Sequence, residues 1–216
     1  MPHLIIVVRN LTTPVYENSI FINCPFDEQF QPLLRAIVFT AYSCGFHPIS
    51  ALAEQNSMDN RLDKIFRLIE QCKFGIHDIS RIELTQEGLP RFNMPFELGV
   101  FFGAKRFGNR NQRLKNALIF EKTKYLYQKY LSDINGVDII THEGIIENVI
   151  VEVRNWLLNT SDTNIVASPL EIINSFKNFT KKLDGRGLKL GFNEYYDFPF
   201  KEFSFLIKEY LFDHPT

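Results

Sequence analysis

From Ser19 onward, short apolar runs alternate with longer stretches in which apolar residues recur every three or four positions. The short runs predict strands, and the longer stretches predict amphipathic helices. Strands that alternate with helices are typical of βα units, which build a parallel sheet covered by helices. The chain is therefore predicted to form an α/β domain, with strands at 19–23, 46–50, 74–77, 116–121 and 137–141.

Capping residues and prolines set the expected limits of the helices. Asp27 and Asp59 are predicted to cap the first two helices, and the first of these runs to about Cys44. Asn93 opens the third helix, with Pro95 in its first turn, where proline is tolerated because that N–H has no helical partner. The last helix of the domain is expected at 143–158.

The chain is predicted to divide into an α/β domain and a smaller helical extension that is rich in phenylalanine. A polar stretch at 159–164 is expected to link them, and glycines separate two helices in the extension. Residues 4–8 are predicted as an extra edge strand. The domain spans 1–158 and the extension 159–216, with helices at about 169–183 and 199–212 around Gly185, Gly187 and Gly191.

The extension holds more phenylalanines than the core of two short helices needs. A face for a partner would use them, and so would docking onto the first domain; both alternatives stay open. In the first case the chain is a homo-oligomer that associates through its extension. The residues are Phe176, Phe179, Phe192, Phe198, Phe200, Phe203, Phe205 and Phe212.

The charge balance excludes several classes of partner. The chain has 24 basic and 25 acidic residues and a net charge of -1, so it has no global field for a nucleic-acid backbone or an anionic membrane. No apolar run approaches the ~18 residues of a membrane span. We therefore expect a protein that binds neither membranes nor nucleic acids, and any nucleotide ligand must be held locally.

Cysteine spacing and phosphate-loop motifs narrow the chemistry further. Three cysteines, an odd number without Cys-x-x-Cys spacing, suggest neither a disulfide framework nor a metal site, and a cytoplasmic location fits them best. Neither Gly-x-Gly-x-x-Gly nor Gly-x-x-x-x-Gly-Lys-Ser/Thr occurs, which argues against dinucleotide redox enzymes and P-loop ATPases. We expect no resident cofactor, and a nucleotide as substrate instead.

In an open parallel sheet, ligands bind in the crevice outside the carboxyl ends of the strands, where the strand order reverses. Candidate residues, most of them polar, follow each of the first three predicted strands and begin the next helix, and one arginine near the start of the second helix can reach the same crevice. These candidate binding residues are Asn23, Pro25, Phe26, Ser50, Glu54, Arg61, Asp78, Ser80, Arg81, Asn93 and Glu97, with Asp27 beside them.

Two carboxylates and one or two arginines in one crevice suit cleavage of an N-glycosidic bond between a ribose and a base. The transition state has oxocarbenium character, so a carboxylate beneath the anomeric carbon stabilises it or attacks it. Glu97 is the candidate for that role. Asp78 is expected to hold ribose hydroxyls or to manage the proton on the leaving base, and Arg61 or Arg81 to pair with a phosphate.

Each candidate also has an ordinary structural explanation. A glutamate in the first turn of a helix is favoured by the helix dipole, and Asp78 can be a turn former after a strand. Arg61 can pair with Asp63 or Glu54 on the surface. The apolar residues that flank Glu97 strengthen its functional interpretation, because an embedded glutamate needs a partner or a function.

Three further residues are assigned to structure. His77 is expected to be a core histidine, and Cys24, which lies beside the crevice, to be a buried inert thiol. His142, followed by Glu143, is taken as the start of a helix, because no second histidine follows one turn later as a zinc site requires.

Three segments resemble bacterial proteins related to nucleoside 2-deoxyribosyltransferases and to TIR domains. They are Ser-Ile-Phe-Ile-Asn-Cys-Pro-Phe-Asp at 19–27, Gly-Ile-His-Asp-Ile-Ser-Arg at 75–81 and Phe-Asn-Met-Pro-Phe-Glu-Leu-Gly at 92–99. The resemblance covers roughly 19–158 and implies a flavodoxin-like fold with five parallel strands. In both groups a Glu-Leu pair begins a helix beside the nucleotide pocket, which places Glu97 there.

The two groups imply different reactions for Glu97. In the deoxyribosyltransferases the matching glutamate is the nucleophile, and an aspartate in the position of Asp78 binds the sugar. In catalytic TIR domains it supports cleavage of NAD into nicotinamide and ADP-ribose products, often in antiviral defence that depends on assembly. This chain departs from both patterns: Asn93 stands where the transferases usually have an aspartate, and Asn-Met-Pro-Phe replaces the Trp-Cys pair of TIR domains.

The expected function is therefore N-glycosidic cleavage of a nucleotide, with NAD placed ahead of a deoxynucleoside monophosphate. A nucleoside or deoxynucleotide 2-deoxyribosyltransferase or hydrolase is the alternative reaction. A non-catalytic module that recognises a nucleotide through the same crevice is the alternative from another class, because members of one fold can lose their chemistry.

Overall fold

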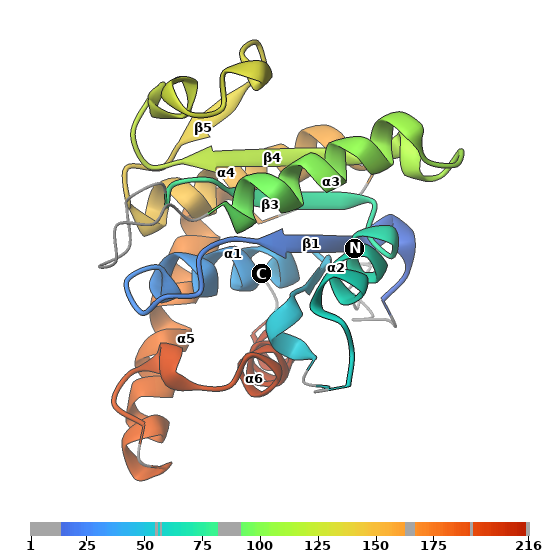
Figure 1. Ribbon diagram of the computed structural model, residues 1–216. Helices are drawn as coiled ribbons and strands as arrows, with labels where there is room; N and C mark the ends of the chain where they lie inside the picture. The colour runs from blue at the N-terminus through green and yellow to red at the C-terminus, as the bar shows by residue number, and fades with distance from the viewer. Residues whose placement is uncertain are drawn as a thin grey trace, which may run out of the picture.

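The computed structural model describes residues 14–54, 56, 58–81, 92–162, 167–190 and 192–214. Five parallel strands form one sheet with the order β2-β1-β3-β4-β5, which is the flavodoxin-like order (Figure 1). This confirms the predicted fold class. The strands are β1 (Ser19–Asn23), β2 (His47–Ile49), β3 (Phe74–Asp78), β4 (Asn116–Glu121) and β5 (Ile139–Thr141).

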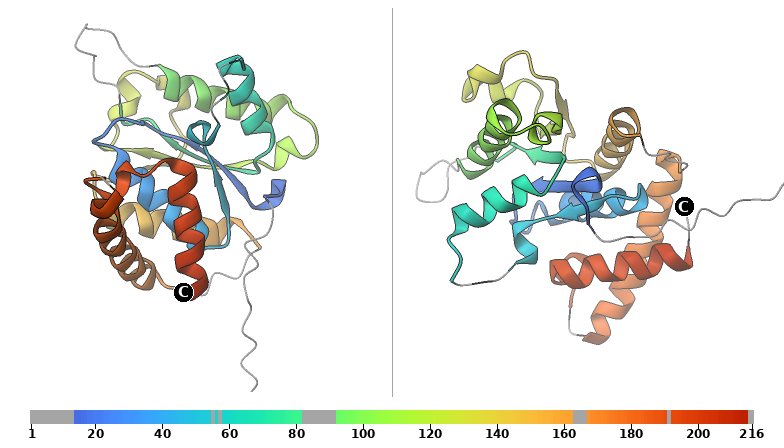
Figure 2. Two further views of the ribbon diagram at one scale, coloured as in Figure 1. Left: turned by 90° about the horizontal axis from the view of Figure 1, so that it is seen from below. Right: turned by 90° about the vertical axis from the view of Figure 1, so that its right-hand side faces the viewer.

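Helices cover both faces of this sheet (Figures 1 and 2). Ile20 and Ile22 of β1 pack in one apolar cluster with α1 and α4, whereas Phe21 between them packs with α2 and α3. Successive side chains of a strand point to opposite faces, so one strand serves both layers. The helices are α1 (Gln31–Ser43), α2 (Arg61–Glu70), α3 (Asn93–Phe107) and α4 (Ile146–Thr160).

Most predicted elements are confirmed, but three helix starts differ. Asp27 does not cap α1; its Oδ1 accepts a hydrogen bond from the Phe30 N–H (3.2 Å) in the turn before the helix. Asn60, rather than Asp59, caps α2 by accepting from the Leu62 N–H at 2.8 Å. The predicted start of α4 at Glu143 is wrong, because Glu143 and the next residue adopt left-handed φ values of 58° and 76°.

The C-terminal extension packs on the α1 and α4 side of the sheet (Figure 2). Its helices are α5 (Pro169–Leu190) and α6 (Phe200–Asp213). The predicted end of the first helix at 183 is wrong, since α5 continues through Gly185 and Gly187. At Gly187 an added Cβ would lie 3.4 Å from the Phe192 and Phe198 side chains, so the missing side chain makes room for the following loop.

Five phenylalanines of the extension are buried in the same core as α1 and α4, whereas Phe205 and Phe212 stay 59% and 77% exposed. Docking onto the first domain therefore accounts for most of these aromatic residues. The five are Phe176, Phe179, Phe198, Phe200 and Phe203.

Several sequence predictions lie outside the described residues. They are the edge strand at 4–8 and the last two residues of the linker predicted at 159–164; the first two residues of that linker belong to α4, which ends at Thr160. None of the helices in the described part of the chain is long and apolar enough to cross a membrane. Short 3-10 helices lie in the connections: η1 (Tyr16–Asn18), η2 (Ala51–Ala53), η3 (Gln112–Leu114), η4 (Leu126–Lys129), η5 (Ser132–Ile134) and η6 (Tyr195–Asp197).

Candidate functional site at the carboxyl edge of the sheet

Asn23 ties the ends of β1 and β3 to the start of α3. Its side chain is 1% exposed, and its Nδ2 donates to the Met94 carbonyl at 2.9 Å and contacts His77 Nδ1 at 3.0 Å. A carbonyl oxygen can only accept, which fixes the orientation of the amide and makes His77 Nδ1 an acceptor. Asn23 therefore holds the first turn of α3 against the carboxyl edge of the sheet.

His77 is the core histidine that the sequence predicted. It is fully buried, and its ring packs edge-on against Phe101 with centroids 4.9 Å apart. Burial, and then the charge of Lys115, lowers its pKa to about 3. A neutral imidazole with its proton on Nε2 agrees with the hydrogen bond that Nδ1 accepts from Asn23. His77 thus contributes shape and a hydrogen-bond acceptor to the site and brings no charge.

We expect Asn23→Ala to lower the free energy of unfolding by about 1–3 kcal/mol, because it leaves the buried acceptor on His77 without its donor and frees the start of α3. Urea denaturation at pH 7.5 measures this. Asn193→Ala, at an exposed position in a loop, is the matched control and should change stability by less than about 0.5 kcal/mol. Equal effects of the two variants would contradict this anchoring role.

Glu97 is a buried carboxyl group just beyond the first turn of α3. The helix begins at Asn93, so Glu97 is four residues further on, where the influence of the helix dipole has faded. Its side chain is 7% exposed and makes no hydrogen bond or ion pair with any described residue. Burial raises its pKa to about 7, and the charge of Arg61 opposes part of this rise. The dipole explanation therefore does not account for Glu97.

The raised pKa of Glu97 has a consequence for stability. A folded-state pKa above the unfolded value of 4.5 means that the native state binds this proton more tightly, so stability falls as the pH rises from about 4.5 to about 7. Glutamine does not ionise, so the Glu97→Gln variant should not lose this stability as the pH rises. We expect the variant to gain stability relative to the parent protein on going from pH 5 to pH 8, by on the order of 2 kcal/mol.

Denaturant titrations at both pH values test this expectation, with Glu209→Gln at an exposed position as the matched control. The control should show the same difference from the parent protein at pH 5 and pH 8. If Glu97→Gln also behaved alike at the two pH values, the carboxyl group would have an ordinary pKa.

Asp78 is fully buried in a separate hydrogen-bonded cluster. Its Oδ1 accepts from the Ser80 N–H at 2.9 Å, and its Oδ2 lies 3.0 Å from His142 Nε2. His142 Nδ1 accepts from the Gly144 N–H at 2.8 Å, so the imidazole proton is on Nε2 and is donated toward Asp78. Both oxygens of Asp78 thus have protein partners.

The sheet separates Asp78 from Glu97. Asp78 points to the same face as Phe74 and Ile76, which pack with α1 and α4, whereas α3 covers the other face. Asn23 and His77 lie on the side of Glu97. The structure therefore brings Asn23 and Glu97 together, and it does not place Asp78 beside them as the sequence suggested.

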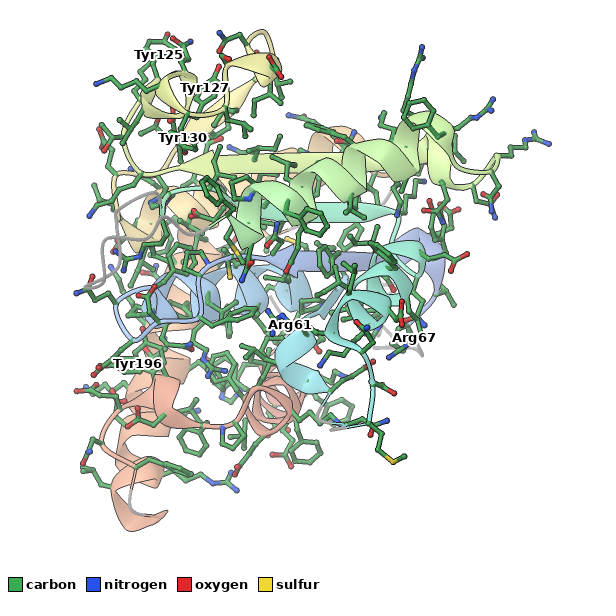
Figure 3. The ribbon with its side chains drawn as sticks, in the orientation of Figure 1. Arg61, Arg67, Tyr125, Tyr127, Tyr130 and Tyr196 are labelled. Carbon is green, nitrogen blue, oxygen red and sulfur yellow. The ribbon has the colours of Figure 1, made fainter. Side chains whose placement is uncertain are left out.

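Of the arginines, Arg81 forms a two-pronged ion pair with Asp27 at 2.7 and 3.1 Å. Arg61 was predicted to pair with Asp63 or Glu54, but Glu54 pairs with Arg67 at 2.7 Å, and Asp63 does not pair with Arg61 either. Arg61 lies at the start of α2 (Figure 3) and is exposed. No described residue forms a hydrogen bond or an ion pair with it. Arg61 thus has no described partner, and it is the arginine whose charge acts on Glu97.

The remaining predicted residues occupy different environments. Ser50 is buried, and its Oγ accepts from the Leu52 N–H at 3.3 Å, so it caps η2. Pro25 is buried, Phe26 is half-buried against the core, and Asn93 is exposed at the start of α3. Cys24 is buried, as predicted, and its thiol pKa is raised well above the usual value, first by burial.

Sequence reasoning missed His142, which is 1% exposed and bonded to Asp78 across the sheet. Its position directly after the fifth predicted strand was the available signal, because residues at strand ends share one edge of a parallel sheet. His142, Ser80 and Lys122 line a pocket of ≈ 230 Å³ at this edge.

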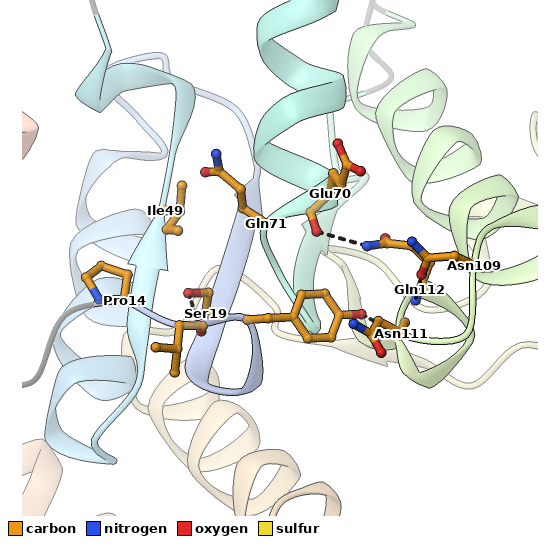
Figure 4. A pocket seen from close by; sticks show the side chains of 10 residues that line it. Pro14, Ser19, Ile49, Glu70, Gln71, Asn109, Asn111 and Gln112 are labelled. Carbon is orange, nitrogen blue, oxygen red and sulfur yellow. Dashed lines mark hydrogen bonds between the residues drawn. The ribbon is translucent and has the colours of Figure 1, made fainter.

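A second pocket, of ≈ 380 Å³, lies at the opposite edge of the sheet (Figure 4). It is lined by Ser19, where β1 begins, by Glu70 at the end of α2 and the following Gln71, and by Gln112 in η3. Tyr16 closes one side, where its hydroxyl donates to the Asn111 carbonyl at 2.6 Å. This pocket is remote from the carboxyl edge that carries Glu97.

No group of three His, Cys, Asp or Glu side chains among the described residues is arranged to hold a metal ion. Comparisons with protein-family models, with curated proteins and with solved structures found no match to this chain.

Proposed function

We propose that this chain cleaves the N-glycosidic bond of a nucleotide, with NAD as its first substrate and nicotinamide and ADP-ribose as products. The observation that carries the proposal is the Glu97 carboxyl group, which is buried, has no described partner and has its pKa raised to about 7. It lies at the carboxyl edge where the strand order reverses, which is the ligand crevice of this fold. A buried carboxyl group of this kind in a crevice is a candidate for catalysis.

In the proposed reaction the Glu97 carboxylate faces the anomeric carbon of the ribose that carries nicotinamide. The C–N bond breaks, its electron pair leaves with the base, and the carboxylate stabilises the oxocarbenium ion. Water then adds to the anomeric carbon, and Glu97 accepts the proton that the water loses. The reaction consumes one water and releases one proton.

The leaving group is what favours NAD over a deoxynucleoside. Nicotinamide is a cation in NAD and leaves as a neutral base, so its departure needs no acid. A purine or pyrimidine is neutral in its nucleoside and needs a proton to leave well. Asp78 points to the other face of the sheet and Asn93 is an amide, so no second carboxyl group is placed with Glu97 among the described residues.

Arg61 is the proposed partner for a phosphate of the substrate. It is exposed, and its charge acts on Glu97. Arg81, the other candidate, is engaged by Asp27 and Gln29. A phosphate on Arg61 would place the negative end of the nucleotide on the same side of the sheet as Glu97.

A non-catalytic nucleotide-binding module is the second candidate. The engagement of both Asp78 oxygens and of Arg81 by other protein groups favours it, because fewer groups are then free to act on a substrate. This candidate predicts that nucleotides raise the unfolding midpoint while no product forms.

Incubating the purified protein with NAD, a deoxynucleoside monophosphate and a deoxynucleoside, and measuring the free base released, tests the proposal. We expect nicotinamide from NAD and slower or no release from the other two. Faster release of a purine or pyrimidine base would favour the deoxyribosyl reaction. No free base from any of them, with thermal stabilisation by NAD, would favour the binding module and contradict hydrolysis.

A further inference from the structure

The pocket of ≈ 230 Å³ at the carboxyl edge lies on the α1 and α4 side of the sheet. Loops that follow three neighbouring strands meet there: Ser80 follows β3, Lys122 follows β4 and His142 follows β5. The turn before α1 and the start of that helix close the other side with apolar groups, among them Phe30 and Leu33. Glu97 is not among the lining residues, so this is a separate cavity.

The protonation of His142 makes the Ser80 hydroxyl a donor toward this pocket. Gly144 donates to Nδ1 at 2.8 Å, so the proton is on Nε2. Nε2 lies 3.0 Å from Asp78 Oδ2 and 3.0 Å from Ser80 Oγ, so the two oxygens share its single N–H as acceptors. Ser80 Oγ therefore keeps its own hydrogen for another acceptor, and among the described residues no such acceptor bonds to it.

The charged side chains that line the pocket are cationic. Lys122 and Arg81 line it, and none of the described lining residues is a carboxylate. The nearby acid Asp78 is fully buried behind Ser80 and His142, and Asp27 is paired with Arg81. Lys122 makes no hydrogen bond or ion pair with a described residue.

The Lys122 side chain lies close to Gly144 beside the pocket. The Gly144 φ of +76° is a conformation that side chains rarely adopt, and an added Cβ would lie 3.8 Å from the Lys122 Cε. The lysine stem thus lies over this glycine, which also lines the cavity.

We propose that this pocket binds a phosphate group, either as inorganic phosphate or as the phosphate monoester of a nucleotide. The Ser80 hydroxyl and the Lys122 ammonium are donors that have no acceptor among the described residues, and Lys122 is the lining charge that no described carboxylate pairs with, so a phosphate oxygen would accept from both. Its volume is below the roughly 300–1,000 Å³ of pockets that enclose a whole drug-sized ligand, which suits a small group. The proposal does not depend on Glu97 or on catalysis.

Thermal unfolding with inorganic phosphate, AMP and adenosine, all at one ionic strength, tests this site. We expect saturable stabilisation by phosphate and AMP and none by adenosine. Tighter binding of AMP than of phosphate would identify a nucleotide as the source of the group, and equal binding would identify free phosphate. Binding of inorganic phosphate is measured without any turnover, so failure of the proposed catalysis leaves this result unaffected, and Glu209→Gln, at an exposed position on α6, should bind phosphate as the parent protein does.

Variants locate the site. Lys122→Met and Ser80→Ala should each weaken phosphate binding at least about tenfold, because each removes one donor. Lys124→Met, an exposed lysine that does not line the pocket, is the matched control and should bind normally. Stabilisation by adenosine alone, no stabilisation by any ligand, or unchanged binding in both Lys122→Met and Ser80→Ala would overturn the proposal.

Discussion

Replacing Phe203 by alanine is expected to lower the free energy of unfolding by about 3–5 kcal/mol. Phe203 lies on α6 and is fully buried. The Arg35 guanidinium lies over the Phe203 ring, 4.6 Å from its centroid, in a cation–π contact. The same ring packs against Phe179 with centroids 5.6 Å apart. Removing the ring leaves a cavity between α6, α5 and α1, and it removes the aromatic face that covers a buried cation.

Arg35 adds to this effect. It is 4% exposed, and burial lowers its pKa to about 10. Its guanidinium donates to the Tyr196 and Phe198 carbonyls, both at 2.9 Å, so it links α1 to the connection between the two C-terminal helices. Loss of Phe203 therefore weakens the attachment of the whole extension to the α/β domain.

Phe205→Ala is the matched control for Phe203→Ala. Phe205 is on the same helix but is 59% exposed, so its truncation should change stability by less than about 0.5 kcal/mol. Urea denaturation measures both variants. Similar losses in the two would contradict docking of α6 through Phe203. Self-association through the extension stays a prediction, and Phe205 and Phe212 are the exposed aromatic residues through which it would occur.

The sequence predicted the strands best because their local signal is strong. The bounds of β1 and β4 match the prediction, since each is an apolar run that polar residues delimit. Helix starts were harder, because neighbouring residues can cap equally well, as Asp59 and Asn60 can. The extent of α5 depends on tertiary packing, because burial of one helical face outweighs the low helix propensity of two glycines.

For the candidate site, the sequence predicted correctly that these residues lie at the carboxyl edge of the sheet. It did not predict to which face of the sheet each side chain points. Asn23, Asp78 and Glu97 all lie near the carboxyl edge, as predicted. Which face Asp78 points to depends on which helices cover each face, and that follows only from the assembled fold. His142 was missed because its partner Asp78 is far away in the sequence and joins it only when β3 and β5 lie in one sheet.

Glu97→Gln is expected to lower kcat/KM for release of nicotinamide from NAD by about 100- to 1,000-fold, because it removes the charge that stabilises the oxocarbenium ion. The glutamine is close to isosteric, so the fold is preserved, and the denaturant titrations described above check this. Glu209→Gln, at an exposed position on α6, should keep full activity.

The pH dependence of kcat/KM for NAD cleavage tests the role of Glu97 most directly, since it reports the ionisation of the free enzyme. If the ionised carboxylate acts, kcat/KM should rise about tenfold per pH unit below pH 7 and level off above it, because burial raises the Glu97 pKa to about 7. The residual rate of Glu97→Gln should lack this transition. Full activity in Glu97→Gln, or the same transition in that variant, would contradict the account.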